Sequence, residues 1–170
     1  SIAWADSPST ARINSPVVFT DFGREVLIND AGDKIAVGAV NLLGKGVVMI
    51  FNLEDNGWSL SATINQPDNL PKEINFGKTF DLDSDFNLIS ISAPGSSSLI
   101  GRNFLFFNGT RSWEHYKTLG ESSSSVGDGF GSSVSIDDDG KYVAIGAPND
   151  ATVSSHLGKT YQYAGNFSFL

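Results

Sequence analysis

The dipeptide Phe-Gly recurs at a constant interval, and this repeat constrains the fold more than any other feature of the chain. The three copies, each 54 residues after the one before, are Phe22-Gly23, Phe76-Gly77 and Phe130-Gly131. A corner of small residues starts sixteen residues after each Phe: Gly38-Ala39-Val40, Ser92-Ala93-Pro94 and Gly146-Ala147-Pro148. Markers that keep their spacing over three units indicate a tandem repeat of one structural unit.

Each unit reads as four short strands separated by turn residues. One apolar run follows Phe-Gly, and a second ends at the small-residue corner. A third begins after Gly44, Gly101 or Gly158, and a fourth follows an Asn- and Gly-rich hairpin. No helical periodicity is present. Four antiparallel strands in about 40–55 residues is the size of a propeller blade. We therefore predict an all-β fold of blade-like sheets, with one irregular β-sandwich as the alternative.

The spacing also predicts where each blade begins and ends. Trp4 and Trp58 each lie 18 residues before the Phe of the following unit, and Trp113 lies 17 before it. Residues 1–8 are therefore expected to form the fourth, outer strand of a preceding blade. The predicted units are residues 1–21 as outer strand and connector, 22–75 as blade 1, 76–129 as blade 2 and 130–170 as blade 3.

These residues resemble the FG-GAP repeat of the propellers at the N-terminus of integrin α-subunits and their relatives. The resemblance rests on Phe-Gly and Gly-Ala-Pro, which are complete in the third unit and partial in the first two. It implies that the Phe wedges between sheets and that Ala-Pro ends a strand. Such propellers usually close with seven blades. Three blades cannot close a ring, so we expect either a longer propeller or a ring completed by another chain.

Composition and charge exclude several classes of function. The formal net charge is −8, and an acidic surface repels phosphate backbones and anionic membranes. No nucleic-acid partner is expected. No apolar run approaches 18 residues, so no membrane insertion is expected. The absence of cysteine excludes disulfides and thiolate chemistry. The expected partners are other blades of the same propeller or other protein chains, and glycans.

The run Asp137-Asp138-Asp139-Gly140 raises the question of a calcium site. Calcium needs six to eight oxygen ligands, usually on alternating positions of a loop. Three consecutive aspartates cannot all point inward, and Lys141 follows where another ligand is wanted. We therefore predict a polar hairpin turn and no cofactor. Asp81, Asp83 and Asp85 do alternate, and they are the remaining candidates for a calcium ion.

No catalytic constellation is evident. Of the two histidines, His115 alternates with aromatic residues in a strand, and His156 lies in a Ser-rich loop. Neither belongs to a Ser-His-Asp pattern, and no paired acids stand out. The chain is therefore predicted not to be an enzyme. The tryptophans are expected on outer strands, with packing as their main role.

Loops that differ between units are the expected binding elements, because binding often resides in variable loops on a constant scaffold. The loops after the second strand and the connections between blades differ in length and should share one face. The candidate ligand-binding residues are Asn69, Lys72, Glu73, Ser97, Asp128, Asn149, Asp150 and His156. Two glycosylation sequons, at Asn108 and Asn166, are expected on the opposite face.

Together these features predict a non-enzymatic binding or adhesion module that recognises protein or glycan through the loops of one face. An extracellular location, on a cell or particle surface, is expected. Two alternatives stay open. The chain could be a structural subunit that packs through its open blade faces, or a propeller accessory to an enzyme domain.

Overall fold

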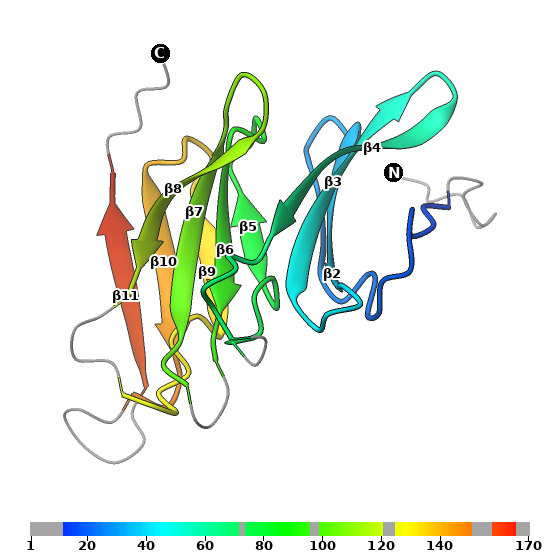
Figure 1. Ribbon diagram of the computed structural model, residues 1–170. Coiled ribbons are helices and arrows are strands. Elements are labelled where there is room, and N and C mark those ends of the chain that lie inside the picture. The colour runs from blue at the N-terminus through cyan, green and yellow to red at the C-terminus, as the bar shows by residue number, and fades with distance from the viewer. Residues whose placement is uncertain (1–11, 72–73, 96–98, 121–124, 151–157, 166–170) are drawn as a thin grey trace, which may run out of the picture.

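The computed structural model describes residues 12–71, 74–95, 99–120, 125–150 and 158–165, and apart from a 3₁₀ conformation at Ile74 the regular elements in these ranges are β-strands. The strands form three antiparallel sheets, arranged one after another along the chain (Figure 1). The predicted all-β fold of propeller blades is confirmed. The described sheets do not close into a ring.

The first sheet, blade 1, has the strand order β1-β2-β3-β4, and the second, blade 2, has the order β5-β6-β7-β8. The strands of blade 1 are β1 (Val26–Ile28), β2 (Lys34–Val40), β3 (Gly46–Glu54) and β4 (Gly57–Asn65). Those of blade 2 are β5 (Phe80–Leu82), β6 (Leu88–Ala93), β7 (Arg102–Asn108) and β8 (Trp113–Leu119). Each is a simple up-and-down sheet, as the four-strand pattern predicts.

Blade 3 contains β9 (Ser133–Ile136), β10 (Tyr142–Ala147) and β11 (Lys159–Ala164), in the order β11-β10-β9. Its predicted fourth strand lies outside the described residues, and so does the predicted outer strand at residues 1–8. The sheets fall within the predicted units, while the exact unit boundaries stay predictions.

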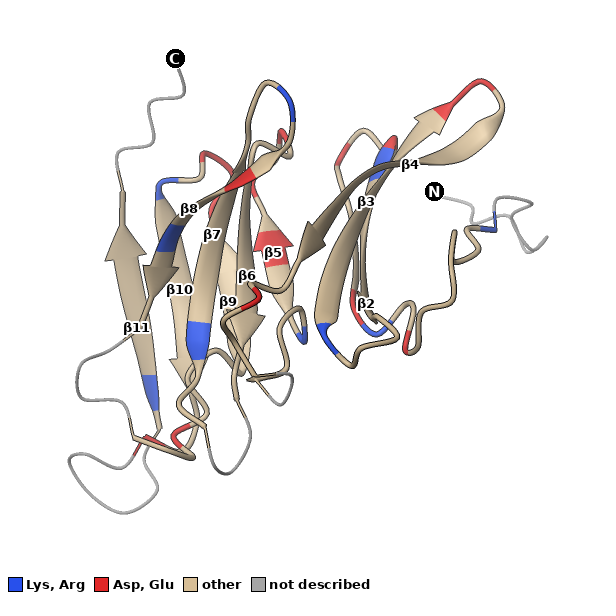
Figure 2. Cartoon of the chain, in the orientation of Figure 1, with Lys and Arg blue, Asp and Glu red and all other residues tan. Residues whose placement is uncertain are grey.

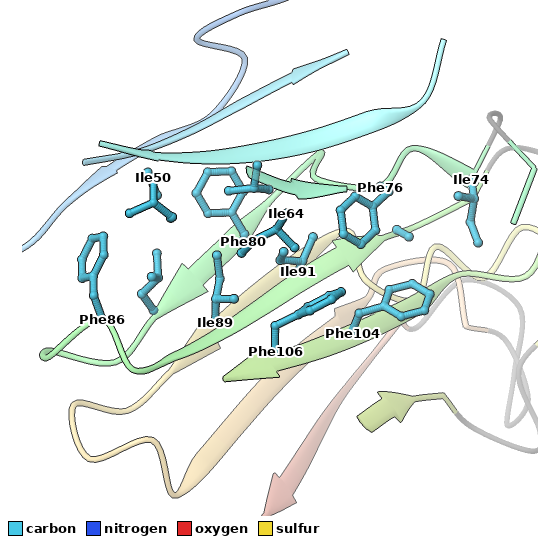
Figure 3. Packing of buried hydrophobic residues seen from close by; sticks show 14 residues of the cluster. Ile50, Ile64, Ile74, Phe76, Phe80, Phe86, Ile89, Ile91, Phe104 and Phe106 are labelled. Carbon is cyan, nitrogen blue, oxygen red and sulfur yellow. The ribbon is translucent and has the colours of Figure 1, made fainter. Parts of the chain in front are cut away.

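The cores lie between the sheets rather than within them. One cluster joins blades 1 and 2, with Ile50 and Ile64 facing Phe76, Phe80 and their neighbours (Figure 3). A second cluster joins blades 2 and 3 around Phe130. We call these two contacts the first and second seams. A third cluster covers the outer face of blade 1, where Ile13 and Phe19 pack on β2 and β3. Because β3 is covered on both faces from Gly46 to Phe51, its sequence is a continuous apolar run from Val47 to Phe51.

The Phe of each Phe-Gly pair packs on the third strand of its own blade. The ring of Phe76 lies 5.6 Å from that of Phe104 and 6.2 Å from that of Phe106, between the centroids. Its carbonyl oxygen faces Gly46 of blade 1, with no room for a Cβ atom there. Phe130 repeats this arrangement with Tyr161 and Gly101. The predicted wedge is confirmed, and the close backbone approach is made possible by glycine.

The turns divide between two edges of the sheets. The hairpins that join first to second and third to fourth strands lie on one edge, at the top of Figure 1. We call this the hairpin edge. The loops between second and third strands and the connections between blades lie on the other, which we call the loop edge. These two types of loop therefore share one edge, as the sequence predicted. Acidic residues are found mainly in the turns of both edges (Figure 2).

Candidate functional site

The first aspartate of the acid run closes a hairpin. The Asp137 Oδ1 atom accepts a hydrogen bond from the backbone N–H of Tyr142 at 2.8 Å. The backbone N–H of Gly140 donates to the Asp137 carbonyl, and Lys141 pairs with Asp139 at 2.7 Å. The lysine, with the hydrogen bond that it donates, holds the pKa of the Asp139 carboxyl below its usual range. The predicted polar turn is confirmed.

Equivalent residues, 54 positions apart, accept hydrogen bonds from turn amides in all three blades. We call this side-chain-to-backbone hydrogen bonding the hairpin lock. The Asn29 Oδ1 atom accepts from the backbone N–H groups of Asp33 and Lys34 at 3.0 and 2.9 Å. The Asp83 Oδ1 atom accepts from those of Asn87 and Leu88 at 2.7 and 3.0 Å. The shared position is therefore an acceptor for turn amides, which is a common role of Asn and Asp.

Asp83 differs from its two counterparts because it is buried. Only 5% of its surface is exposed. Burial raises the pKa of the Asp83 carboxyl above its usual value, and the hydrogen bonds from Leu88 and Asn87 oppose that rise. The residue that closes this turn is Phe86, which adopts φ 59° where the other blades place Gly32 and Gly140 at φ 73° and 67°. This left-handed conformation costs a non-glycine residue about 1–2 kcal/mol.

The three alternating aspartates do not converge. Asp81 lies at the second seam, where its Oδ2 atom accepts from the backbone N–H of Ile136 at 2.9 Å and from the Ser135 hydroxyl at 3.2 Å. Asp83 turns into its own hairpin, and Asp85 is exposed. Within the described ranges, no three His, Cys, Asp or Glu side chains gather in a group that could hold a metal ion. Asp83 therefore stabilises its turn, and Asp81 joins blades 2 and 3 at the second seam.

Four of the predicted ligand-binding residues can be placed, and all four lie on the loop edge. Lys72, Glu73, Ser97 and His156 lie outside the described residues. Asp128, Asn149 and Asp150 come together below blade 3, where the Asn149 backbone N–H donates to the Asp128 carbonyl at 3.0 Å. Asp150 is buried, accepts from the Tyr161 hydroxyl and pairs with Lys159 at 3.1 Å. Backbone hydrogen bonds and the side chain of Asp150 hold this group together.

Asn69 lies apart from that group, on the connection from blade 1 to blade 2. This connection forms one wall of a groove of about 460 Å³, whose other wall is the face of blade 2. The lining residues are Pro67, Asn69, Leu70, Arg102, Phe104, His115 and Thr118. A volume of this size is within the usual range for small-molecule sites. We call it the connection groove.

The wall of the connection groove is anchored by one buried amide. The Gln66 Nε2 atom donates to the carbonyl oxygens of Leu70 and Pro71 at 3.1 and 2.9 Å. Its Oε1 atom accepts from the backbone N–H of Gly46 at 3.2 Å. Gln66 therefore ties the connection back to β3. The groove is preformed, because its wall is held by hydrogen bonds rather than by the ligand.

The polar groups of the connection groove come from distant parts of the sequence. Arg102 begins β7, and His115 lies in β8 with its Nε2 atom 3.0 Å from the Thr118 hydroxyl oxygen. The His115 ring also contacts the ring of Phe106 at 5.4 Å between centroids. The sequence predicted His115 to lie among aromatic residues in a strand but did not predict Arg102 in a site. No local pattern joins these two residues to Asn69.

The hairpin edge carries a separate groove of about 280 Å³ between blades 1 and 2. Lys34, Asn108, Arg111 and Trp113 are among its lining residues. Asn108, the first sequon, is exposed at the corner between β7 and β8, as predicted for the edge opposite the variable loops. Asn166, the second sequon, lies outside the described residues. Trp58 and Trp113 are on outer strands and pack against buried clusters, in agreement with their predicted role.

Comparison with known proteins identifies the repeat. The model of the FG-GAP repeat family matches residues 113–163, which run from the outer strand of blade 2 through β11 of blade 3. No curated protein matches the chain. Among the described residues, none belongs to a helix long and apolar enough to cross a membrane. The chain therefore contains an FG-GAP repeat at residues 113–163, and its three antiparallel sheets are consistent with β-propeller blades.

Proposed function

We propose that this chain is a non-enzymatic recognition module, extracellular or surface-located, whose loop edge binds a protein or glycan. The connection groove is the observation that carries the proposal. It combines an apolar floor, formed by the largely buried ring of Phe104, with polar groups that can orient a ligand, on a scaffold that is otherwise acidic. Sites that recognise small ligands or exposed side chains commonly have this composition.

The chemistry of the groove favours a ligand that offers hydrogen-bond acceptors. The Arg102 guanidinium supplies several donors in a planar fork, which suits carboxylates and vicinal hydroxyl oxygens. The Asn69 amide both donates and accepts. An acidic sugar or an Asp or Glu side chain of a protein partner meets these requirements, since each presents a carboxylate beside an apolar or hydroxylated surface.

A binding experiment on the intact chain tests the proposal. The labelled chain is applied to an array of neutral and acidic glycans and to an array of acidic peptides. We expect retention on acidic members of one array, lost in Arg102→Ala and reduced in Asn69→Ala. Arg111→Ala is the matched control, because Arg111 lines the groove of the hairpin edge. Binding that survives Arg102→Ala but not Arg111→Ala would place the binding site on the hairpin edge and contradict the proposal. Binding to neither array, or hydrolysis of an arrayed glycan, counts against the proposal as a whole.

A further inference from the structure

The first seam departs from the repeat at its hairpin edge, and strand register shows how. Lys34 pairs with Asn52 at the start of β2, and Leu88 pairs with Phe107 at the start of β6. The two pairs are equivalent, because Lys34 and Leu88 are 54 residues apart. In blade 2 the pair is apolar and packs in the cluster of the second seam. In blade 1 the same place holds two polar side chains.

The residue that meets Lys34 across the seam is exchanged as well. In the second seam Leu88 faces Gly140, where a Cβ atom would lie 3.3 Å from the Leu88 Cδ2 atom. In the first seam Lys34 faces Phe86, with its Nζ atom 6.0 Å from the ring centroid. Phe86 and Gly140 are again 54 residues apart. A contact between lysine and an aromatic ring therefore replaces a contact between leucine and glycine.

Phe86 holds its place at a conformational cost. It adopts φ 59°, and its ring is buried at one end of the first-seam cluster, near Ile50 (Figure 3). Strained residues of this kind persist where the surrounding structure fixes them, and they concentrate at ligand sites. The ring keeps the Lys34 ammonium at the seam by a cation–π contact. Lys34 also donates to the Asp85 carbonyl oxygen at 3.4 Å, and its other ammonium hydrogens can serve a ligand.

The groove of about 280 Å³ at this place, which we call the hairpin groove, is locally cationic. Arg111 lines it from the β7–β8 hairpin, so blades 1 and 2 each supply one cation. In the described part of the chain, neither Lys34 nor Arg111 forms an ion pair. No acidic residue lines the groove, although Asp83 acts on Lys34 electrostatically. On a chain of net charge −8, such a site favours an anionic ligand.

The other lining side chains suit a sugar ring. Trp113 is half-buried against the first-seam cluster and offers an aromatic surface to the apolar C–H face of a sugar. A volume of about 280 Å³ is at the small end of the range for ligand pockets, which suits a single ring. Hydroxyl and amide groups, which can bond to sugar hydroxyls, come from Asn52, Ser61, Asn108, Thr110 and Ser112.

We propose that the hairpin groove binds a hexose that carries a phosphate ester. Such an ester has a charge of about −1.5 to −2 at pH 7 and accepts charge-assisted hydrogen bonds, which matches the pair Lys34 and Arg111. The ring lies against Trp113 and the neighbouring hydroxyl and amide groups. The ligand thereby bridges blades 1 and 2. The proposal does not rest on the connection groove, which lies on the opposite edge and is proposed for carboxylates.

Isothermal titration calorimetry on the whole chain tests the proposal. The chain is produced in a bacterial host that attaches no N-glycans, because a glycan on Asn108 would compete for the groove. The probes are the 6-phosphates of glucose, galactose and mannose, each compared with its neutral hexose and with inorganic phosphate at equal ionic strength. We expect at least one ester to bind about tenfold or more tightly than both comparisons, because neither comparison offers both halves of the ligand.

Two variants each remove one cation from the hairpin groove. Lys34→Leu introduces the residue type that blade 2 has at Leu88, so the variant is expected to keep the far-UV circular dichroism of the parent. Lys34→Leu and Arg111→Ala should each weaken ester binding about tenfold or more, because a hydrogen bond to a charged group is lost. Lys117→Leu is the matched control, since Lys117 is an exposed lysine of β8 that lines neither groove.

Three results would overturn the proposal. One is equal affinity for the ester and for inorganic phosphate or the neutral hexose, because the groove would then read only half of the ligand. Another is ester binding that Lys34→Leu and Arg111→Ala leave undiminished. The third is binding that is lost in Arg102→Ala and retained in Arg111→Ala. It would assign the ester to the connection groove and leave the proposed function of the loop edge intact.

Discussion

The hairpin lock provides a graded test of how burial sets the strength of one interaction. Asn29, Asp83 and Asp137 occupy the same turn position in three blades, but they differ in the number and burial of the amides that they accept. Asp83 accepts from two, one of them buried; Asn29 accepts from two that are more exposed; Asp137 accepts from one exposed amide. Alanine at each position removes the acceptor and leaves those amides to find water.

The magnitudes follow from that geometry. A buried donor left without a partner costs about 1–3 kcal/mol, and an exposed one costs less because water replaces the acceptor. Asp83→Ala loses two such bonds but also relieves the burial of a carboxylate, so we expect a loss of about 2 kcal/mol. Asn29→Ala should lose about 1 kcal/mol and Asp137→Ala about 0.5 kcal/mol. The order of the three values matters more than each value.

Urea unfolding followed by tryptophan fluorescence measures the series, with and without added calcium. Asp83→Asn serves as the control, because it keeps the Oδ1 acceptor. The reasoning is refuted if Asp137→Ala is the most damaging substitution. It is equally refuted if calcium stabilises the parent chain and this gain disappears in Asp137→Ala, since the acid run would then be an ion site and not a turn.

Two further predictions concern the seam and the buried carboxylate. Gly101→Ala should destabilise the chain by about 1–3 kcal/mol, because the new methyl group forces blades 2 and 3 apart. Gly120→Ala, whose Cβ would meet nothing within 4 Å, should be neutral, and equal urea midpoints for the two variants would contradict the seam geometry. Because the folded-state pKa of Asp83 is raised, stability is lost as pH rises from the usual aspartate value of about 4 through the raised value. Asp83→Asn should therefore be more stable than the parent at pH 7 and equal to it near pH 3, and a destabilised variant at pH 7 would show that its hydrogen bonds outweigh its burial.

Local chemistry made the blades predictable. Phe-Gly, the small-residue corner and the Asn, Asp and Gly turns act over a few residues, so their spacing indicates strand number and order without knowledge of distant contacts. The role of the acid run was predictable for the same reason, since three consecutive aspartates alternate between faces whatever surrounds them.

Tertiary structure decided which side chains meet. Phe86 takes a left-handed turn position normally given to glycine, at a site where its ring is buried in the first seam, and no sequence rule anticipates that exchange. Asp81 bonds to a strand 55 residues away. Arg102, His115 and Asn69 line one groove, whose wall Gln66 ties to β3 by hydrogen bonds. Repeat spacing encodes contacts within a blade, whereas the seams and the grooves depend on how one blade packs against the next.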